Sequence, residues 1–127
     1  MIPNWVRPLF LAAAIYDLVL GLVFGLGFKA IYTRFGIALP NHDAYVQLPA
    51  AMIAIFGLGF WMVSRDPVRN RNLIVLGVLL KLAFSGVVLG HRFFAGIPDL
   101  WVPFAVADAI FMFAFLAALR AVPATRG

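Results

Sequence analysis

Four long apolar segments, separated by short polar stretches, dominate the pattern of the chain. Each is long enough to cross a hydrocarbon core of ~30 Å as a helix that rises about 1.5 Å per residue. We place these spans at about residues 9–28, 44–63, 73–90 and 101–119. The pattern therefore predicts an all-α integral membrane protein, a bundle of four transmembrane helices that forms a single domain over residues 1–127.

The composition supports this prediction. Hydrophobic residues make up 65% of the chain and charged residues 12%, whereas soluble domains are about half apolar and about a quarter charged. There is no cysteine, which excludes disulfides and thiolate nucleophiles. The formal charge of +5 does not indicate nucleic acid as a partner, because the arginines lie at the ends of the apolar segments and form no basic face. Their positions suit contact with lipid headgroups of the bilayer.

The basic residues also predict the orientation of the spans, because cytoplasmic loops carry the excess of positive charge. One side of the membrane holds six: Arg7, Arg65, Arg69, Arg71, Arg120 and Arg126. The other side holds three: Lys29, Arg34 and Arg92. We therefore expect a protein of the cell (inner) membrane with both termini cytoplasmic and with His42 and His91 in the outward-facing loops.

The loops carry local patterns of their own. Between residues 28 and 35, apolar side chains recur at helical spacing opposite polar ones, which predicts a short helix lying in the membrane interface. Asp43 and Asp99 precede the second and fourth spans and are expected to cap them. Asp66, followed by a proline, is expected to be a turn residue.

Three ionisable residues lie too deep to belong to the span ends. Counted from the cytoplasmic side, Asp17, Lys81 and Asp108 lie at depths of about 12, 12 and 16 Å. An unpaired charge at this depth costs roughly 2.5–3.5 kcal/mol or more, and ion pairing offsets much of that cost. We expect the three side chains to meet in one buried layer, whose formal charge of −1 invites a shared proton or a polar partner.

Neighbouring residues are candidates to line this layer. Tyr16, Gln47 and Ser85 fall close to its depth or above it. On the second span, a small and partly polar face formed by residues 47, 51, 54 and 58 is expected to point inward, because small residues at this spacing mark helix contacts in membranes. The layer itself has three interpretations: a structural element, a proton or ion relay, or a binding site for a small polar or lipid-like molecule.

Other chemistry has little support in the sequence. His42 and His91, with Asp43 or Asp99, lack the spacing of a metal site, so no metal is assigned. We find no catalytic triad and no glycine-rich phosphate loop, so no catalytic residue is named and nothing demands an enzyme. The sequence does not identify a cofactor, which stays unknown.

Several stretches resemble a known family. They are AAIYDLVLG in the first span, RFGIALP before the second, FGLGFWMVSRDP at its end, and LIVLGVLLKL and ADAIFMFAFLAAL in the third and fourth. Together they resemble the small four-helix bacterial membrane proteins that are DoxX-like in size and layout, over nearly the whole chain. The resemblance implies a four-helix fold whose recurring polar positions would be Asp17, Lys81 and Asp108, and it implies no particular activity.

Three classes of function stay open. The first is a non-enzymatic bundle, either an accessory subunit of a membrane complex or a small lipophile-binding protein. The second is a proton-coupled transporter that acts as an oligomer, and the third is an intramembrane enzyme for a sterol- or quinone-like substrate. The candidate partners are the bilayer, a second copy or a larger membrane complex, and a lipid-like small molecule.

Overall fold

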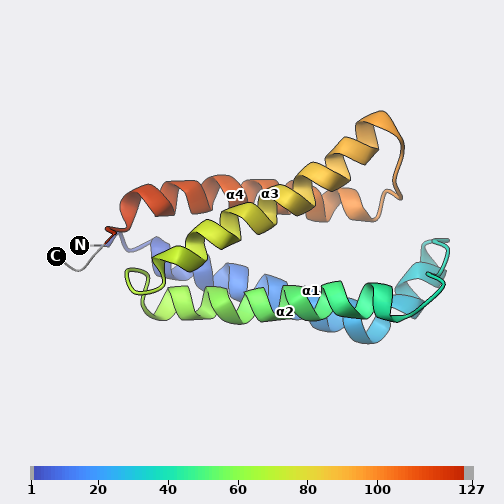
Figure 1. The fold of residues 1–127 in the computed structure, drawn as a ribbon, viewed down its shortest axis with the longest axis horizontal. Helices are drawn as coiled ribbons and strands as arrows, with labels where there is room; N and C mark the ends of the chain where they lie inside the picture. The colour runs from blue at the N-terminus through green and yellow to red at the C-terminus, as the bar shows by residue number, and fades with distance from the viewer. Residues whose placement is uncertain (1, 125–127) are drawn as a thin grey trace.

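A computed structural model describes residues 2–124, and these residues form four helices and no strand. The helices are α1 (Val6–Arg34), α2 (Ala44–Arg65), α3 (Arg71–Phe94) and α4 (Trp101–Ala121) (Figure 1). All four are long and apolar enough to cross a membrane. The expectation of an all-α protein with four candidate membrane spans is therefore confirmed. Arg126, which entered the charge count above, lies outside the described residues.

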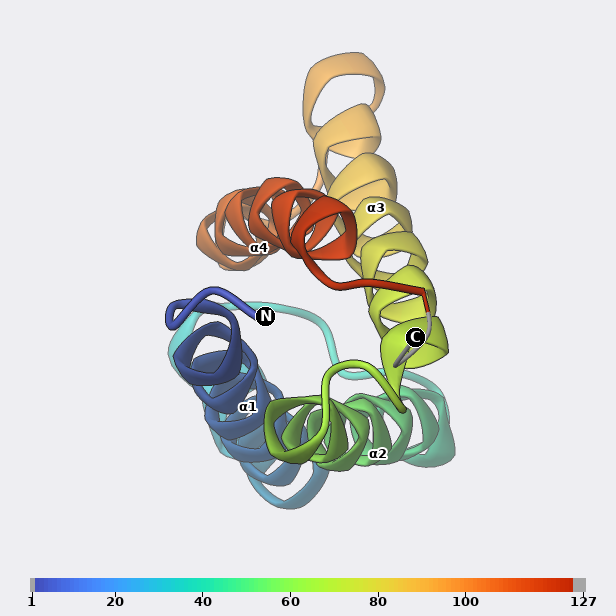
Figure 2. The ribbon, with the colours of Figure 1, turned by 90° about the vertical axis from the view of Figure 1, so that its left-hand side faces the viewer.

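The helices pack as two pairs. α1 packs closely along α2, and α3 packs along α4, while fewer contacts join one pair to the other. The end-on view in Figure 2 shows the two pairs facing each other. Figure 1 shows the start of α1 and the end of α4 at one end of the bundle, together with the α2–α3 loop. We call this the terminal end, and we call the opposite end, with residues 35–43 and 95–100, the loop end.

α1 is longer than the sequence predicted. It runs without a break from Val6 to Arg34, so residues 28–34 form its last turns and not a separate short helix. Phe28 and Tyr32 are buried in these turns, and their rings meet edge to face at 5.6 Å. Because these two side chains pack into the bundle, the helix continues where the pattern had suggested a new one.

The expected cap at the start of α2 was wrong. Asp43 occupies the position before the helix, but its side chain makes no capping hydrogen bond. It instead forms an exposed ion pair with Lys29, in which Nζ lies 3.0 Å from Oδ2. The backbone N–H of Ala44 donates to His42 Nδ1 at 3.1 Å. The carboxylate of Asp43 therefore pairs with Lys29 near the end of α1. The imidazole of His42 accepts the hydrogen bond from the backbone at the start of α2.

The other two loop aspartates differ from each other. α4 begins after Leu100, with no capping hydrogen bond from a side chain, and Asp99 lies instead 3.8 Å from Arg92. The prediction that Asp99 caps α4 was therefore wrong. Asp66 accepts a hydrogen bond from the backbone N–H of Arg69 at 3.2 Å, which confirms it as a turn residue.

Glycines allow α1 and α2 to approach closely. A Cβ atom at Gly21 would lie 2.6 Å from the carbonyl oxygen of Ala50 and 2.8 Å from the nitrogen of Ala54. A Cβ atom at Gly57 would lie 2.8 Å from the nitrogen of Leu18. Since both glycines face the backbone of the partner helix, the pair is held by close contact of small residues, as is common in membranes.

The close contact with α1 determines how α2 is rotated about its own axis, and this rotation differs from the expected one. Gln47, Ala51 and Leu58 are exposed, and only Ala54 of the predicted inward stripe is partly covered. The face that packs against α1 includes Gly57, which lies among the buried residues of α2. Adjacent residues on a helix point about 100° apart, so a stripe shifted by one residue faces largely away from the interface.

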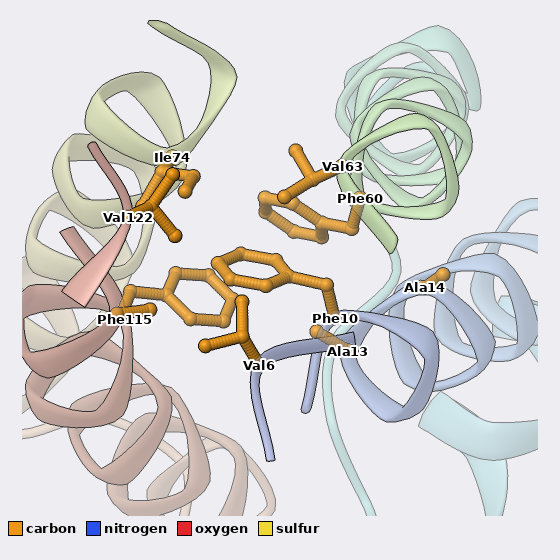
Figure 3. Packing of buried hydrophobic residues seen from close by; sticks show 10 residues of the cluster. Val6, Phe10, Ala13, Ala14, Phe60, Val63, Ile74, Phe115 and Val122 are labelled. Atoms are coloured by element: carbon orange, nitrogen blue, oxygen red, sulfur yellow. The ribbon is translucent and has the colours of Figure 1, made fainter. Parts of the chain in front are cut away.

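An aromatic cluster fills the bundle at the terminal end. Phe10 of α1 stacks on Phe115 of α4 with ring centroids 4.5 Å apart, and Phe60 of α2 meets Phe115 at 5.1 Å. Figure 3 shows these rings pointing toward one another, with Ile74 of α3 and Val122 on the same core. All four helices therefore meet in a closed core on this side.

An arginine in each helix pair ties its two helices together at the terminal end. Arg7, near the start of α1, donates from Nη1 to the carbonyl oxygen of Arg65 at 2.7 Å. Arg71, at the start of α3, donates to the carbonyl oxygens of Leu119 and Val122 at 2.9 and 3.0 Å. The last carbonyls of a helix have no partner within it, so both arginines satisfy groups at the end of the neighbouring helix.

Candidate functional site

The three deep charges meet near the middle of the bundle. Nζ of Lys81 donates to Asp17 Oδ1 at 2.8 Å, to Asp17 Oδ2 at 3.1 Å and to Asp108 Oδ1 at 3.0 Å. The side chains are 1%, 2% and 9% exposed for Lys81, Asp17 and Asp108. Residues from α1, α3 and α4 therefore form one buried ion cluster, which we call the charged layer. Its membership agrees with the depth count.

Aromatic rings surround the ammonium group. Nζ of Lys81 lies 5.3 Å from the ring centres of Tyr16 and Phe111 and 5.6 Å from that of Phe60. Such contacts add attraction for a cation, and more where water is excluded. The hydroxyl of Tyr16 is buried and has no hydrogen-bond partner among the described residues. Tyr16 therefore contributes to the layer through its ring.

The other two expected lining residues lie elsewhere. The Oγ atom of Ser85 donates to the carbonyl oxygen of Lys81 at 2.6 Å, one turn back on the same helix. This bond occupies its hydroxyl proton. Gln47 is exposed. Neither residue lines the two cavities described next.

A small cavity opens beside the charged layer. Its volume is about 40 Å³, which is enough for water-sized groups. The cavity is lined by Asp17, Lys81 and Asp108 together with Leu20, Ile53, Leu80 and Phe84. α2 contributes only the apolar side chain of Ile53, so every polar group of the lining belongs to the layer.

A larger apolar pocket lies on the loop-end side of the layer. It has a volume of about 290 Å³ and draws its lining from all four helices and from Ile97 of the α3–α4 loop. Aromatic side chains form much of its wall: Phe24, Tyr32, Tyr45, Phe84, Trp101 and Phe104. Phe24 lies 5.3 Å from Trp101 and 5.7 Å from Phe104 between ring centroids. These packed rings give the pocket a defined shape.

The two cavities share part of their lining. Leu20, Ile53 and Phe84 line both the small cavity and the apolar pocket. The apolar pocket therefore ends next to the carboxylates of the charged layer. A long apolar molecule with a polar head would find a matching surface for each part here.

The sequence contains a signal for this pocket that a count of depth alone does not reveal. Leu20 and Phe24 follow Asp17 on α1 at helical spacing, and Phe84 follows Lys81 on α3. Residues three, four and seven apart share one face of a helix. Bulky apolar side chains that extend the face of a buried charge therefore indicate the wall of a cavity at the same interface.

The described residues contain no cluster suited to a metal ion, and no known relative guides the interpretation of the site. Within residues 2–124, no three histidine or aspartate side chains lie close enough together to hold a metal ion. Comparisons with protein-family models, with curated proteins and with solved structures find no match to this chain. The site is therefore interpreted from its own geometry, and the family resemblance depends only on the stretches quoted above.

Proposed function

We propose that this protein is a small non-enzymatic membrane protein that binds a lipophilic molecule in the apolar pocket, with its polar head toward the charged layer. The observation that supports this most directly is the shared lining of Leu20, Ile53 and Phe84 between pocket and layer. Binding sites for small molecules are mostly apolar with a few well-placed polar groups, and their volumes begin at about 300 Å³. The pocket, at about 290 Å³, is close to that lower bound.

The position of the site in the membrane is part of the proposal. With both termini cytoplasmic in the inner membrane, the loop end faces outward and the pocket lies in the outer half of the bilayer. Tyr45 and Pro49 are exposed and also line the pocket, so a lipophile reaches it from the bilayer beside α2. In this orientation the last turns of α1, with Lys29 and Arg34, lie at the outer interface.

The surroundings of the layer favour binding over ion passage. Toward the terminal end, Phe10, Phe60 and Phe115 fill the space between the helices. A relay across the membrane needs polar groups or water along its path, and this aromatic cluster interrupts such a path. We therefore favour a lipophile-binding protein over a proton-coupled transporter.

A pair of neighbouring valines on α3 offers a test. Val88 is 5% exposed and lines the pocket, whereas Val87 is 60% exposed on the outside of the same helix. Val88→Trp should fill part of the pocket, and Val87→Trp adds the same bulk outside it. We expect native mass spectrometry from bilayer nanodiscs to detect a retained lipophile on the wild type and on Val87→Trp, with clear loss on Val88→Trp. Equal retention by all three proteins would contradict the proposal.

A further inference from the structure

Asp108 uses only one of its two carboxylate oxygens. Oδ1 accepts the hydrogen bond from Lys81 at 3.0 Å. Oδ2 has no hydrogen-bond partner among the described residues, although the side chain is only 9% exposed and lines the small cavity. In a side chain as buried as this one, a carboxylate oxygen without a donor is unfavourable. The cavity therefore contains an acceptor that a bound group with an N–H or O–H can satisfy.

The donors around the same cavity are already engaged with the protein's own groups. The ammonium group of Lys81 already donates to Asp17 and to Asp108, and its Nζ lies 5.3 Å from the ring centres of Tyr16 and Phe111. The hydroxyl of Ser85 donates within its own helix, and Tyr16 does not line the cavity. A head that only accepts hydrogen bonds, such as a carboxylate or a quinone carbonyl, would have to compete with Asp17 and Asp108 for the ammonium group of Lys81.

The net charge of the charged layer favours a cationic donor over a neutral one. Two carboxylates and one ammonium give the charged layer a formal charge of −1, with a side-chain burial of at least nine-tenths for each member. In a low-dielectric interior, a cation beside Asp108 would be attracted and a second anion repelled. The ring of Phe84 also lines the cavity and offers a cation a further favourable contact. A neutral alcohol would satisfy the oxygen but leave the charge uncompensated.

We propose that the lipophile is an amine, whose protonated head enters the small cavity and donates to Oδ2 of Asp108 while its apolar chain fills the pocket. This inference rests on the lipophile-binding function proposed above. It narrows the ligand class to lipophilic amines and assigns Asp108 as the residue that determines specificity, with Lys81 holding the other oxygen of that carboxylate in place.

Three probes that share an alkyl chain and differ in the head group distinguish the contributions of head and tail to binding. They are dodecylamine, dodecanol and dodecanoate. Binding of each is measured at neutral pH by native mass spectrometry on protein in nanodiscs, with Val88→Trp as the pocket-filled baseline for partition into lipid. On the wild type we expect dodecylamine to bind roughly tenfold or more tightly than dodecanol above this baseline, because only the ammonium group adds an ion pair with the buried carboxylate. Dodecanoate should bind most weakly of the three.

A substitution locates the selectivity. Asp108→Asn keeps the shape and one oxygen but removes the charge, so dodecylamine should fall to about the affinity of dodecanol, which itself changes little. Asp43→Asn removes an exposed carboxylate outside the cavity and should leave all three affinities unchanged. If Asp108→Asn does not fold, the wild-type probe series decides the question alone.

The outcomes of these measurements distinguish a failure of the amine assignment from a failure of the proposed lipophile binding. If dodecanol or dodecanoate binds as tightly as dodecylamine and Val88→Trp still abolishes binding, the assignment of an amine head is contradicted. The proposed binding of a lipophile in the apolar pocket is then still supported. If the wild type and Val88→Trp bind every probe equally, the proposed function itself fails. If dodecylamine is favoured equally by the wild type and Asp108→Asn, Asp108 does not determine the specificity and the inference is overturned.

Discussion

The sharpest test of the charged layer is the removal of its cation. Lys81→Met keeps an unbranched side chain of similar length but deletes all three hydrogen bonds to Asp17 and Asp108. Two carboxylates then face each other across a space in which both had contacted the same nitrogen. Breaking a buried ion pair by removing one partner costs roughly 3–5 kcal/mol. We expect Lys81→Met to lower the free energy of unfolding by about this amount.

The chain provides a matched control for this substitution. Lys29 pairs with Asp43 at 3.0 Å, the same distance that separates Lys81 from Asp108, but its side chain is 62% exposed. An exposed ion pair contributes only ~0–1 kcal/mol. Lys29→Met should therefore change stability little. Both variants are compared by equilibrium unfolding in mixed micelles at increasing mole fractions of sodium dodecyl sulfate, followed by circular dichroism.

A double variant tests whether the cost arises from the unpaired carboxylates. Asp17→Asn in the Lys81→Met background leaves Asp108 as the single charge of the layer, so the double variant should be more stable than Lys81→Met alone. The coupling energy between the two positions should be roughly 1–3 kcal/mol. If the two single effects add within ~0.5 kcal/mol, or if Lys29→Met destabilises as much as Lys81→Met, the reasoning is refuted.

Three further predictions concern the scaffold. Gly21→Ala should lower stability in the same unfolding assay by roughly 1–3 kcal/mol, because the new methyl group meets the backbone of α2; Gly27→Ala, with no atom within 4 Å of its Cβ, should be neutral or slightly stabilising, and equal losses would contradict this account. Arg71→Met should lose roughly 1–3 kcal/mol in that assay through its two bonds to the end of α4, whereas exposed Arg69→Met should not, so a stable Arg71→Met rules out the tie. In the cysteine-free chain, a membrane-impermeant maleimide should label Ala95→Cys in intact cells and Arg69→Cys only after permeabilisation; the reverse result would invert the orientation.

Much of the architecture follows from the sequence because it depends on one-dimensional quantities. The apolar runs are as long as a bilayer is thick, and the helix rise is constant, so counting residues placed the spans. The same count put Asp17, Lys81 and Asp108 at one depth, and the cost of unpaired charge in a membrane required them to meet. The structure brings these three together as counted.

Other features depend on contacts between segments, and only the tertiary structure decided them. The rotation of α2 follows from the close approach of Gly21 and Gly57 to the partner backbone, which leaves Gln47 exposed. The carboxylate of Asp43 pairs with Lys29 on another helix and not with its own helix start. In such cases interactions within a segment compete with interactions between segments of similar energy. The local sequence pattern does not show which interaction is the more favourable.

The cavity is the clearest case of this division. The sequence by itself determined four helices long and apolar enough to span a membrane, and a buried layer with one formal charge in excess. Only the packing of the two helix pairs decided that the terminal end closes on Phe10, Phe60 and Phe115 while an apolar pocket remains beside the layer. An empty volume is set by how far side chains on four helices reach toward one another, and that depends on rotations and separations that no single segment specifies.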